Sequence, residues 1–156
     1  MSHISKCTTL YKSLDEVEVA GEALGFDLLR EKKSHAWYGR MVGDSAEGIA
    51  TAREFGVENL GKCDHVLRLK THQAGDYEIG VKRMDDGTFA LVYDSWGPGK
   101  RLEDAAGKGL QRFRQEYAVA VTQARMKKTL ARQGFRMTRE QGENGRVRLR
   151  LQRRVG

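Results

Sequence analysis

Four side chains of this sequence have the chemistry of a zinc site. They form two pairs, His3 with Cys7 and Cys63 with His65. Residues an even number apart in a strand lie on one face, so each pair projects from one side of its strand. If the two strands were neighbours, two thiolates and two imidazoles would converge in the tetrahedral set that Zn²⁺ prefers. Isolated buried cysteines and surface histidines explain the same residues, and we assign no metal or other cofactor.

The stretch Cys63-Asp64-His65 contains the residue types of a nucleophilic triad. Adjacent strand residues point to opposite faces, so Asp64 diverges from the other two side chains. The stretch Asp85-Asp86-Gly87 lacks the spaced oxygen ligands and distal glutamate of a calcium loop, and it favours a tight hairpin turn. The sequence therefore names no catalytic residue and predicts a protein that is not an enzyme.

A basic C-terminal third is the best candidate for a binding surface. Residues 1–100 hold 13 Lys and Arg against 16 Asp and Glu, a net charge of −3, whereas residues 101–156 hold 15 against 5, a net charge of +10. Guanidinium groups bind phosphate or carboxylate in a bidentate manner, which suits a polyanion. The candidate binding residues are Arg125, Lys127, Lys128, Arg132, Arg146, Arg148, Arg150, Arg153, Arg154 and Trp96.

Each of these features has a simpler interpretation. A solvated basic face aids solubility without binding anything, and charged residues on a terminal strand prevent edge-to-edge aggregation. Trp37, Tyr38 and Trp96 lie beside glycine-rich segments, where they serve either as buried anchors or as an exposed protein-binding hot spot.

The hydrophobic pattern predicts an α+β fold. Ser13-Leu14-Asp15-Glu16 resembles a capping box, and it starts a short helix that stops at Gly25. A long helix is expected over residues 110–133, followed by a hairpin in which Val147, Leu149 and Leu151 alternate with arginines. We expect an antiparallel sheet of about six or seven strands packed against one short and one long helix.

The 156 residues are expected to form a single domain, 1–156, with a glycine-rich excursion at about 39–62 that has room for a short helix at 46–55. Gly25-Phe26 and Gly134-Phe135 both follow a helix, which indicates either a duplicated β-α-β-β unit or ordinary helix capping. No apolar run is long enough to insert into a membrane, and no secretory signal is apparent. Cytoplasmic localisation, with both cysteines reduced, is the simplest interpretation.

The sequence also resembles one known family along nearly its whole length, with residues 39–62 matching least. The matching pieces are Met1-Ser2-His3-Ile4-Ser5, Tyr77-Glu78-Ile79-Gly80, Tyr93-Asp94-Ser95-Trp96, Gln115-Glu116-Tyr117-Ala118, and the end from Gly134-Phe135 to Leu149-Arg150-Leu151-Gln152-Arg153. They resemble the hypothetical chloroplast open reading frame 35 family, also called domain of unknown function 1257. Its members are small proteins of plastids, cyanobacteria and other bacteria. The bacterial ones are often encoded near an AAA+ ATPase and a second small protein, which implies an adaptor or substrate role and supplies no catalytic residues.

Three hypotheses for function follow. The first is a non-enzymatic binding or adaptor protein within a protein complex, with an AAA+ ATPase as the implied partner. The second is nucleic-acid (RNA) binding through the arginine-rich face, although no aromatic RNA-binding motif accompanies it. The third is a metal-dependent enzyme at the cluster of His3, Cys7, Cys63 and His65.

Overall fold

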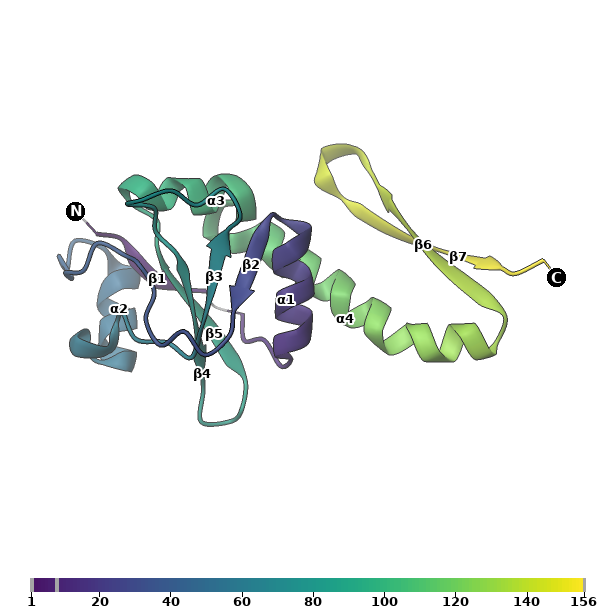
Figure 1. The fold of residues 1–156 in the computed structure, drawn as a ribbon, viewed down its shortest axis with the longest axis horizontal. Coiled ribbons are helices and arrows are strands. Elements are labelled where there is room, and N and C mark those ends of the chain that lie inside the picture. The colour runs from purple at the N-terminus through teal and green to yellow at the C-terminus, as the bar shows by residue number, and fades with distance from the viewer. Residues whose placement is uncertain (1, 8, 156) are drawn as a thin grey trace.

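The computed structural model describes residues 2–7 and 9–155, and its centre is a five-stranded antiparallel sheet (Figure 1). Its strands are β1 (Ile4–Lys6), β2 (Phe26–Leu29), β3 (His65–Leu69), β4 (Ile79–Arg83) and β5 (Phe89–Asp94). Their order across the sheet is β1-β5-β4-β3-β2. The expected hairpin joins β4 to β5, and Gly87 takes the positive φ of 81° that its tight turn requires.

Three helices cover the first face of this sheet. They are α1 (Leu14–Ala23), α3 (Lys100–Ala106) and the first half of α4 (Gln111–Arg132). Their apolar side chains, such as Phe113 of α4, form one core with Leu67, Ile79 and Leu91 of the sheet. Gly21 lets α1 approach closely, because a Cβ there would lie 2.9 Å from Leu67 Cδ2.

The helix boundaries follow the expected capping residues. Ser13 Oγ accepts a hydrogen bond from the Glu16 backbone N–H at 3.5 Å, and Gly25 follows α1 with a φ of 85°. Tyr117 Oη on α4 accepts from the backbone N–H groups of Lys12 and Ser13, which ties the start of α1 to α4. The predicted long helix is confirmed, and it ends one residue before Gln133.

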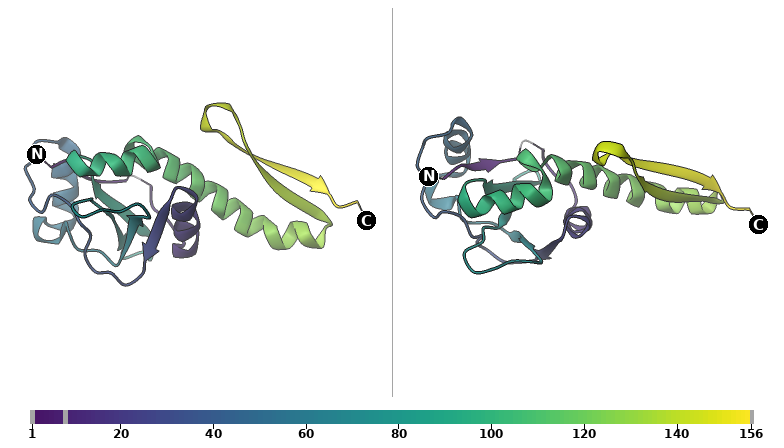
Figure 2. Two further views of the ribbon diagram at one scale, coloured as in Figure 1. Left: turned by 45° about the horizontal axis from the view of Figure 1, so that its top comes forward. Right: turned by 90° about the horizontal axis from the view of Figure 1, so that it is seen from above.

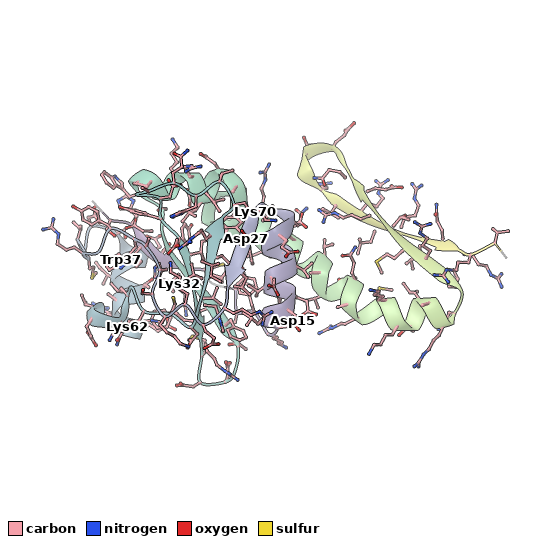
Figure 3. The ribbon with its side chains drawn as sticks, viewed as in Figure 1. Asp15, Asp27, Lys32, Trp37, Lys62 and Lys70 are labelled. Carbon is pink, nitrogen blue, oxygen red and sulfur yellow. The ribbon has the colours of Figure 1, made fainter. Side chains whose placement is uncertain are left out.

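The glycine-rich excursion covers the second face of the sheet. Its short helix α2 (Ala46–Phe55) occupies the predicted residues and packs against β1. Ala52 and Leu60 form a second apolar cluster with Ile4 and Val92, and Trp37 packs against it (Figure 3). The segment is therefore part of the folded body, and the sheet lies between two layers.

The last two strands form a separate sheet. β6 (Phe135–Gln141) and β7 (Val147–Arg153) pair along their whole length in an antiparallel hairpin. The second half of α4 and this hairpin stand out from the body, and the hairpin folds back along α4 (Figure 1; Figure 2). The α+β class and the long helix are thus confirmed, and the strands divide into a sheet of five and a sheet of two.

Across the described residues, no helix combines the length and the apolar character needed to cross a membrane.

Candidate functional site

The net positive charge of the molecule lies in its projecting part. We define the arm as residues 121–155, which comprise the second half of α4, the β6–β7 hairpin and the residues after it. The arm holds 11 Lys and Arg against 2 Asp and Glu, a net charge of +9. The rest of the chain holds 17 against 19, a net charge of −2. The basic third predicted from residue 101 onward therefore narrows to the arm, because residues 101–120 belong to the body.

The hairpin has two chemically different faces. The strand register places Met137 opposite Leu151 and Arg139 opposite Leu149 on one face, the inner face. Arg139 forms a bidentate ion pair with Glu116 of α4, with N···O distances of 2.8 and 2.6 Å, so the inner face is turned toward α4. Arg136, Arg148 and Arg150 lie on the opposite, outer face.

The outer face forms the predicted arginine ladder. Alternate residues of a strand are about 6.8 Å apart, which sets the spacing between the Cα atoms of Arg148 and Arg150 along β7. One acidic residue, Glu140, shares this face, and its Oε1 lies 3.1 Å from Arg150 Nη1. Arg148 and Arg136 are exposed. The outer face can therefore hold a row of anionic groups.

The remaining basic candidates extend this surface. Arg125, Lys127, Lys128 and Arg132 are exposed on the second half of α4. Figure 3 shows side-chain nitrogens distributed along this helix and both strands of the hairpin. Within the described residues, nine of the eleven basic side chains of the arm take part in no ion pair, namely Arg125, Lys127, Lys128, Arg132, Arg136, Arg146, Arg148, Arg153 and Arg154.

Trp96 lies outside the arm, between β5 and α3. Its side chain is 38% exposed and meets Tyr38 edge-on, with 6.1 Å between the ring centroids. The Arg40 guanidinium lies 5.8 Å from the centroid of the Tyr38 ring. Trp37 instead points inward, where its indole nitrogen would lie 2.6 Å from a Cβ on Gly61. Trp96 and Tyr38 thus form an exposed aromatic pair, whereas Trp37 is an anchor.

The structure separates the two Cys/His pairs. The zinc hypothesis required neighbouring strands, but β5 and β4 lie between β1 and β3. Three strand spacings separate β1 from β3 by about 14 Å. Cys7 Sγ lies 3.5 Å from Tyr11 Oη, and His3 Nε2 lies 3.5 Å from Asp44. The assumption of adjacent strands is therefore wrong, and the part of the chain that the structure describes contains no group of three or more His, Cys, Asp or Glu suited to a metal.

Cys63, Asp64 and His65 each face a different partner. Cys63 Sγ donates to the Lys32 carbonyl, Asp64 accepts from the Arg83 backbone N–H, and His65 Nδ1 accepts from the Glu31 backbone N–H. Burial raises the pKa of the Cys63 thiol to about 11 and lowers the pKa of His65. A thiol with this pKa is protonated at neutral pH, which makes it a weak nucleophile.

The buried carboxylate of Glu78 was not predicted from the sequence. Its side chain is 1% exposed and accepts from Lys32 Nζ at 2.8 and 2.6 Å, Arg68 Nε at 2.6 Å and the Ala36 backbone N–H at 2.9 Å. Burial alone would raise the pKa of Glu78, but these donors outweigh it and hold the pKa below its usual value. The only sequence signal was a glutamate next to an apolar strand.

Comparison of the chain with protein-family models, with curated proteins and with solved structures finds no match. The family resemblance therefore stays a prediction from sequence.

Proposed function

We propose that this chain is a non-enzymatic, cytoplasmic nucleic-acid-binding protein that contacts the phosphate backbone with the outer face of its arm. The observation that supports this most directly is the separation of charge, +9 on the arm against −2 on the rest of the chain. Because the rest of the chain is slightly acidic, the positive potential is concentrated on the arm, where a polyanion can reach it.

The shape of the arm also favours a nucleic acid. A two-stranded ribbon fits the major groove of B-form DNA, which is about 12 Å wide, and the outer face of the β6–β7 hairpin is turned away from α4. The outer face carries Arg136, Arg148 and Arg150 but no aromatic side chain, so base stacking has no platform there. We therefore expect contacts to phosphates, with little dependence on base sequence.

Such binding has a characteristic response to salt. If the arm neutralises about five phosphates of a duplex, the logarithm of the association constant falls with a slope of about −4.5 against the logarithm of salt concentration. A rise in salt from about 50 to about 200 mM then weakens binding about 500-fold. The sequence of the duplex should change the affinity much less.

Fluorescence anisotropy with a labelled duplex of about 20 base pairs tests the proposal. The double variant Arg148→Glu/Arg150→Glu should weaken binding at least about tenfold and make the salt slope shallower by about 2. The control Arg53→Glu/Lys100→Glu makes the same change of net charge at exposed positions of α2 and α3. It should weaken binding less than about threefold, because it removes only long-range attraction. Absence of binding at low salt, or equal losses in the two variants, would contradict the proposal.

The same assay with single-stranded RNA of equal length gives a second association constant, and the larger of the two identifies the preferred polymer. The slope is about −0.7 per contact for single strands, so the same number of contacts gives a shallower salt response.

A second candidate function is that of a protein adaptor, and the Trp96–Tyr38–Arg40 cluster favours it. Tryptophan, tyrosine and arginine are the side chains most enriched at binding hot spots. An AAA+ ATPase is the partner that the family resemblance implies. Affinity capture followed by mass spectrometry should then recover an ATPase with the wild type and with Arg148→Glu/Arg150→Glu, but not with Trp96→Ala. Recovery that is unchanged by Trp96→Ala would exclude the aromatic cluster as the docking site.

A further inference from the structure

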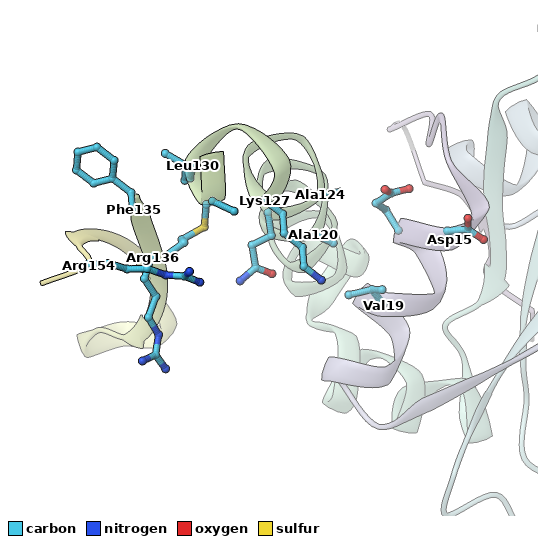
Figure 4. Close-up of a pocket in the computed structure, with 13 residues that line it drawn as sticks. Asp15, Val19, Ala120, Ala124, Lys127, Leu130, Phe135, Arg136 and Arg154 are labelled. Atoms are coloured by element: carbon cyan, nitrogen blue, oxygen red, sulfur yellow. The ribbon is translucent and has the colours of Figure 1, made fainter. Parts of the chain in front are cut away.

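A groove of about 570 Å³ lies on the inner side of the arm, between α1, the second half of α4 and β6 (Figure 4). α4 forms its floor, α1 forms one wall, and the start of β6 with Arg154 forms the other. It borders the outer face at Arg136 but contains neither Arg148 nor Arg150, and it does not include Trp96 or Tyr38.

The lining of the groove is mainly apolar and open to solvent. Val19 of α1 is 50% exposed, whereas Val17 and Ala20 of the same helix are buried. Leu130 at the end of α4 and Phe135 and Met137 of β6 add further apolar side chains to the lining. Removal of apolar surface from water is favourable, so these side chains favour a partner that covers them.

The floor is shaped for another helix. Three alanines on one helical face of α4 line the groove, namely Ala120, Ala124 and Ala131, which are four and seven residues apart. Helices pack with their axes about 8–10 Å apart, and small side chains at the contact allow the lower end of this range. The floor therefore admits an α-helix lying along α4, in the space between α1 and the hairpin.

The two walls carry opposite charges. Asp15 and Glu16 lie on the α1 wall, and Arg136 and Arg154 lie on the hairpin wall. Figure 4 shows Asp15 and the two arginines on opposite sides of α4, with Lys127 projecting from the helix between them. A helix in the groove would meet acid along one edge and base along the other, which fixes the direction in which it lies.

We propose that this groove binds an amphipathic α-helix of a partner protein, whose apolar stripe packs on the alanine floor. One edge of the helix is acidic and faces Arg136 and Arg154, and the other is basic and faces Asp15 and Glu16. Anchors at i, i+3, i+4 and i+7 supply the apolar contact. A second copy of this chain fits less well, because it would bring two arms of net charge +9 together.

The probe is a designed peptide of about 16 residues with leucines at the anchor positions, glutamates along one edge and lysines along the other. A scrambled peptide of the same composition has the same charge but no apolar stripe. We expect saturable binding of the designed peptide in an anisotropy titration, with a gain of helical circular dichroism. The scrambled peptide should bind at least about tenfold more weakly.

Matched substitutions on α4 locate the binding. Ala124→Trp fills the groove from an exposed helical position and should weaken peptide binding at least about tenfold. Ala118→Trp makes the same change at an exposed position of α4 outside the groove and should alter affinity less than about twofold. Val19→Asp, on the α1 wall, should also weaken peptide binding, and this result cannot come from a local effect of tryptophan on α4.

Three results would overturn the proposal. They are equal binding of the two peptides, equal losses in Ala124→Trp and Ala118→Trp, and a dimer in sedimentation velocity that Ala124→Trp dissociates. The last result would assign the groove to a second copy of the chain. Duplex binding should be retained in Ala124→Trp, so failure of the groove proposal is distinguishable from failure of the nucleic-acid proposal.

Discussion

Replacement of Glu78 by glutamine tests how the segment before α2 is held over the sheet. The Glu78 carboxylate receives hydrogen bonds from Lys32, Ala36 and Arg68, so it joins residues 32–36 to β3 and to the start of β4. The Glu78 backbone N–H also donates to the Ala36 carbonyl at 2.9 Å. The side chain is therefore a buried polar connection between this segment and the second face of the sheet.

The expected loss can be worked out from these contacts. Glutamine keeps one acceptor oxygen and places an NH₂ group where the other oxygen accepts from Lys32 and Ala36. Removing one partner of a fully buried ion pair costs about 3–5 kcal/mol. The side chains of Lys32 and Arg68 are 34% and 36% exposed and can turn toward water, so we expect Glu78→Gln to lower the free energy of unfolding at pH 7 by about 2–3 kcal/mol.

The loss should depend on pH in a defined direction. The pKa of Glu78 in the folded protein lies below the ordinary value of 4.5. The charged form therefore stabilises the fold above pH 4.5, and this contribution is lost as pH falls through the folded-state pKa. The difference between wild type and Glu78→Gln should shrink as the solution is acidified below pH 4.5.

Urea unfolding followed by tryptophan fluorescence provides the measurement, since Trp37 lies in the affected layer. Glu22→Gln is the control, because Glu22 is exposed on α1. It should change the free energy of unfolding by less than about 0.5 kcal/mol. If Glu78→Gln matched this control, or if its effect were the same at pH 7 and at low pH, the ion-pair reasoning would be refuted.

Two further predictions concern buried positions of the body. Burial lowers the pKa of His35 to about 4, so its ring should titrate near that pH by NMR. The free energy of unfolding should fall as pH drops from 6.5 toward 4, because the unfolded chain binds this proton first. A ring that titrates near pH 6.5 would contradict this prediction. A Cβ on Gly99 would overlap the Asp94 carbonyl oxygen, so Gly99→Ala should lower the free energy of unfolding in urea by about 3 kcal/mol or more. The control Lys100→Ala, at the next and exposed position, should lower it by less than about 0.5 kcal/mol.

Local signals in the sequence predicted the elements well. Ser13, Gly25 and Gly134 mark helix ends because capping depends on residues within one turn. The Asp-Gly turn at residues 86–87 predicted the β4–β5 hairpin, whose register depends on contiguous residues. The helix at 46–55 was identified within a segment of little amphipathic pattern, and the structure has it at Ala46–Phe55.

Contacts between distant segments could not be predicted in the same way. β1 pairs with β5, which lies about 90 residues later in the chain, and no local pattern specifies that choice. This pairing places two strands between Cys7 and Cys63, which local spacing alone could not reveal. The burial of Glu78 has the same origin, because it depends on residues 32–36 folding over β4.

One signal in β5 did point to the second layer. Phe89–Asp94 is buried at every position, and its apolar run, Phe-Ala-Leu-Val-Tyr, has no polar residue on either face. A strand with one solvated face alternates apolar and polar residues, so a continuous run indicates cover on both faces. In β7 the alternation correctly separated arginines from apolar residues, but it could not show that the hairpin packs on α4 through β6 instead of joining the main sheet.

The hairpin is only weakly attached to the rest of the molecule, and this weak attachment couples binding at the two proposed surfaces. An isolated two-stranded hairpin is marginally stable in water. In this chain the hairpin is held to α4 mainly through β6, by the Arg139–Glu116 pair and by Gln115 Nε2, which donates to the Gly145 carbonyl. Any ligand that binds only the ordered hairpin stabilises it by mass action. A helix in the inner groove and a polyanion on the outer face both meet this condition, so each should strengthen the binding of the other, although Arg136 borders both surfaces.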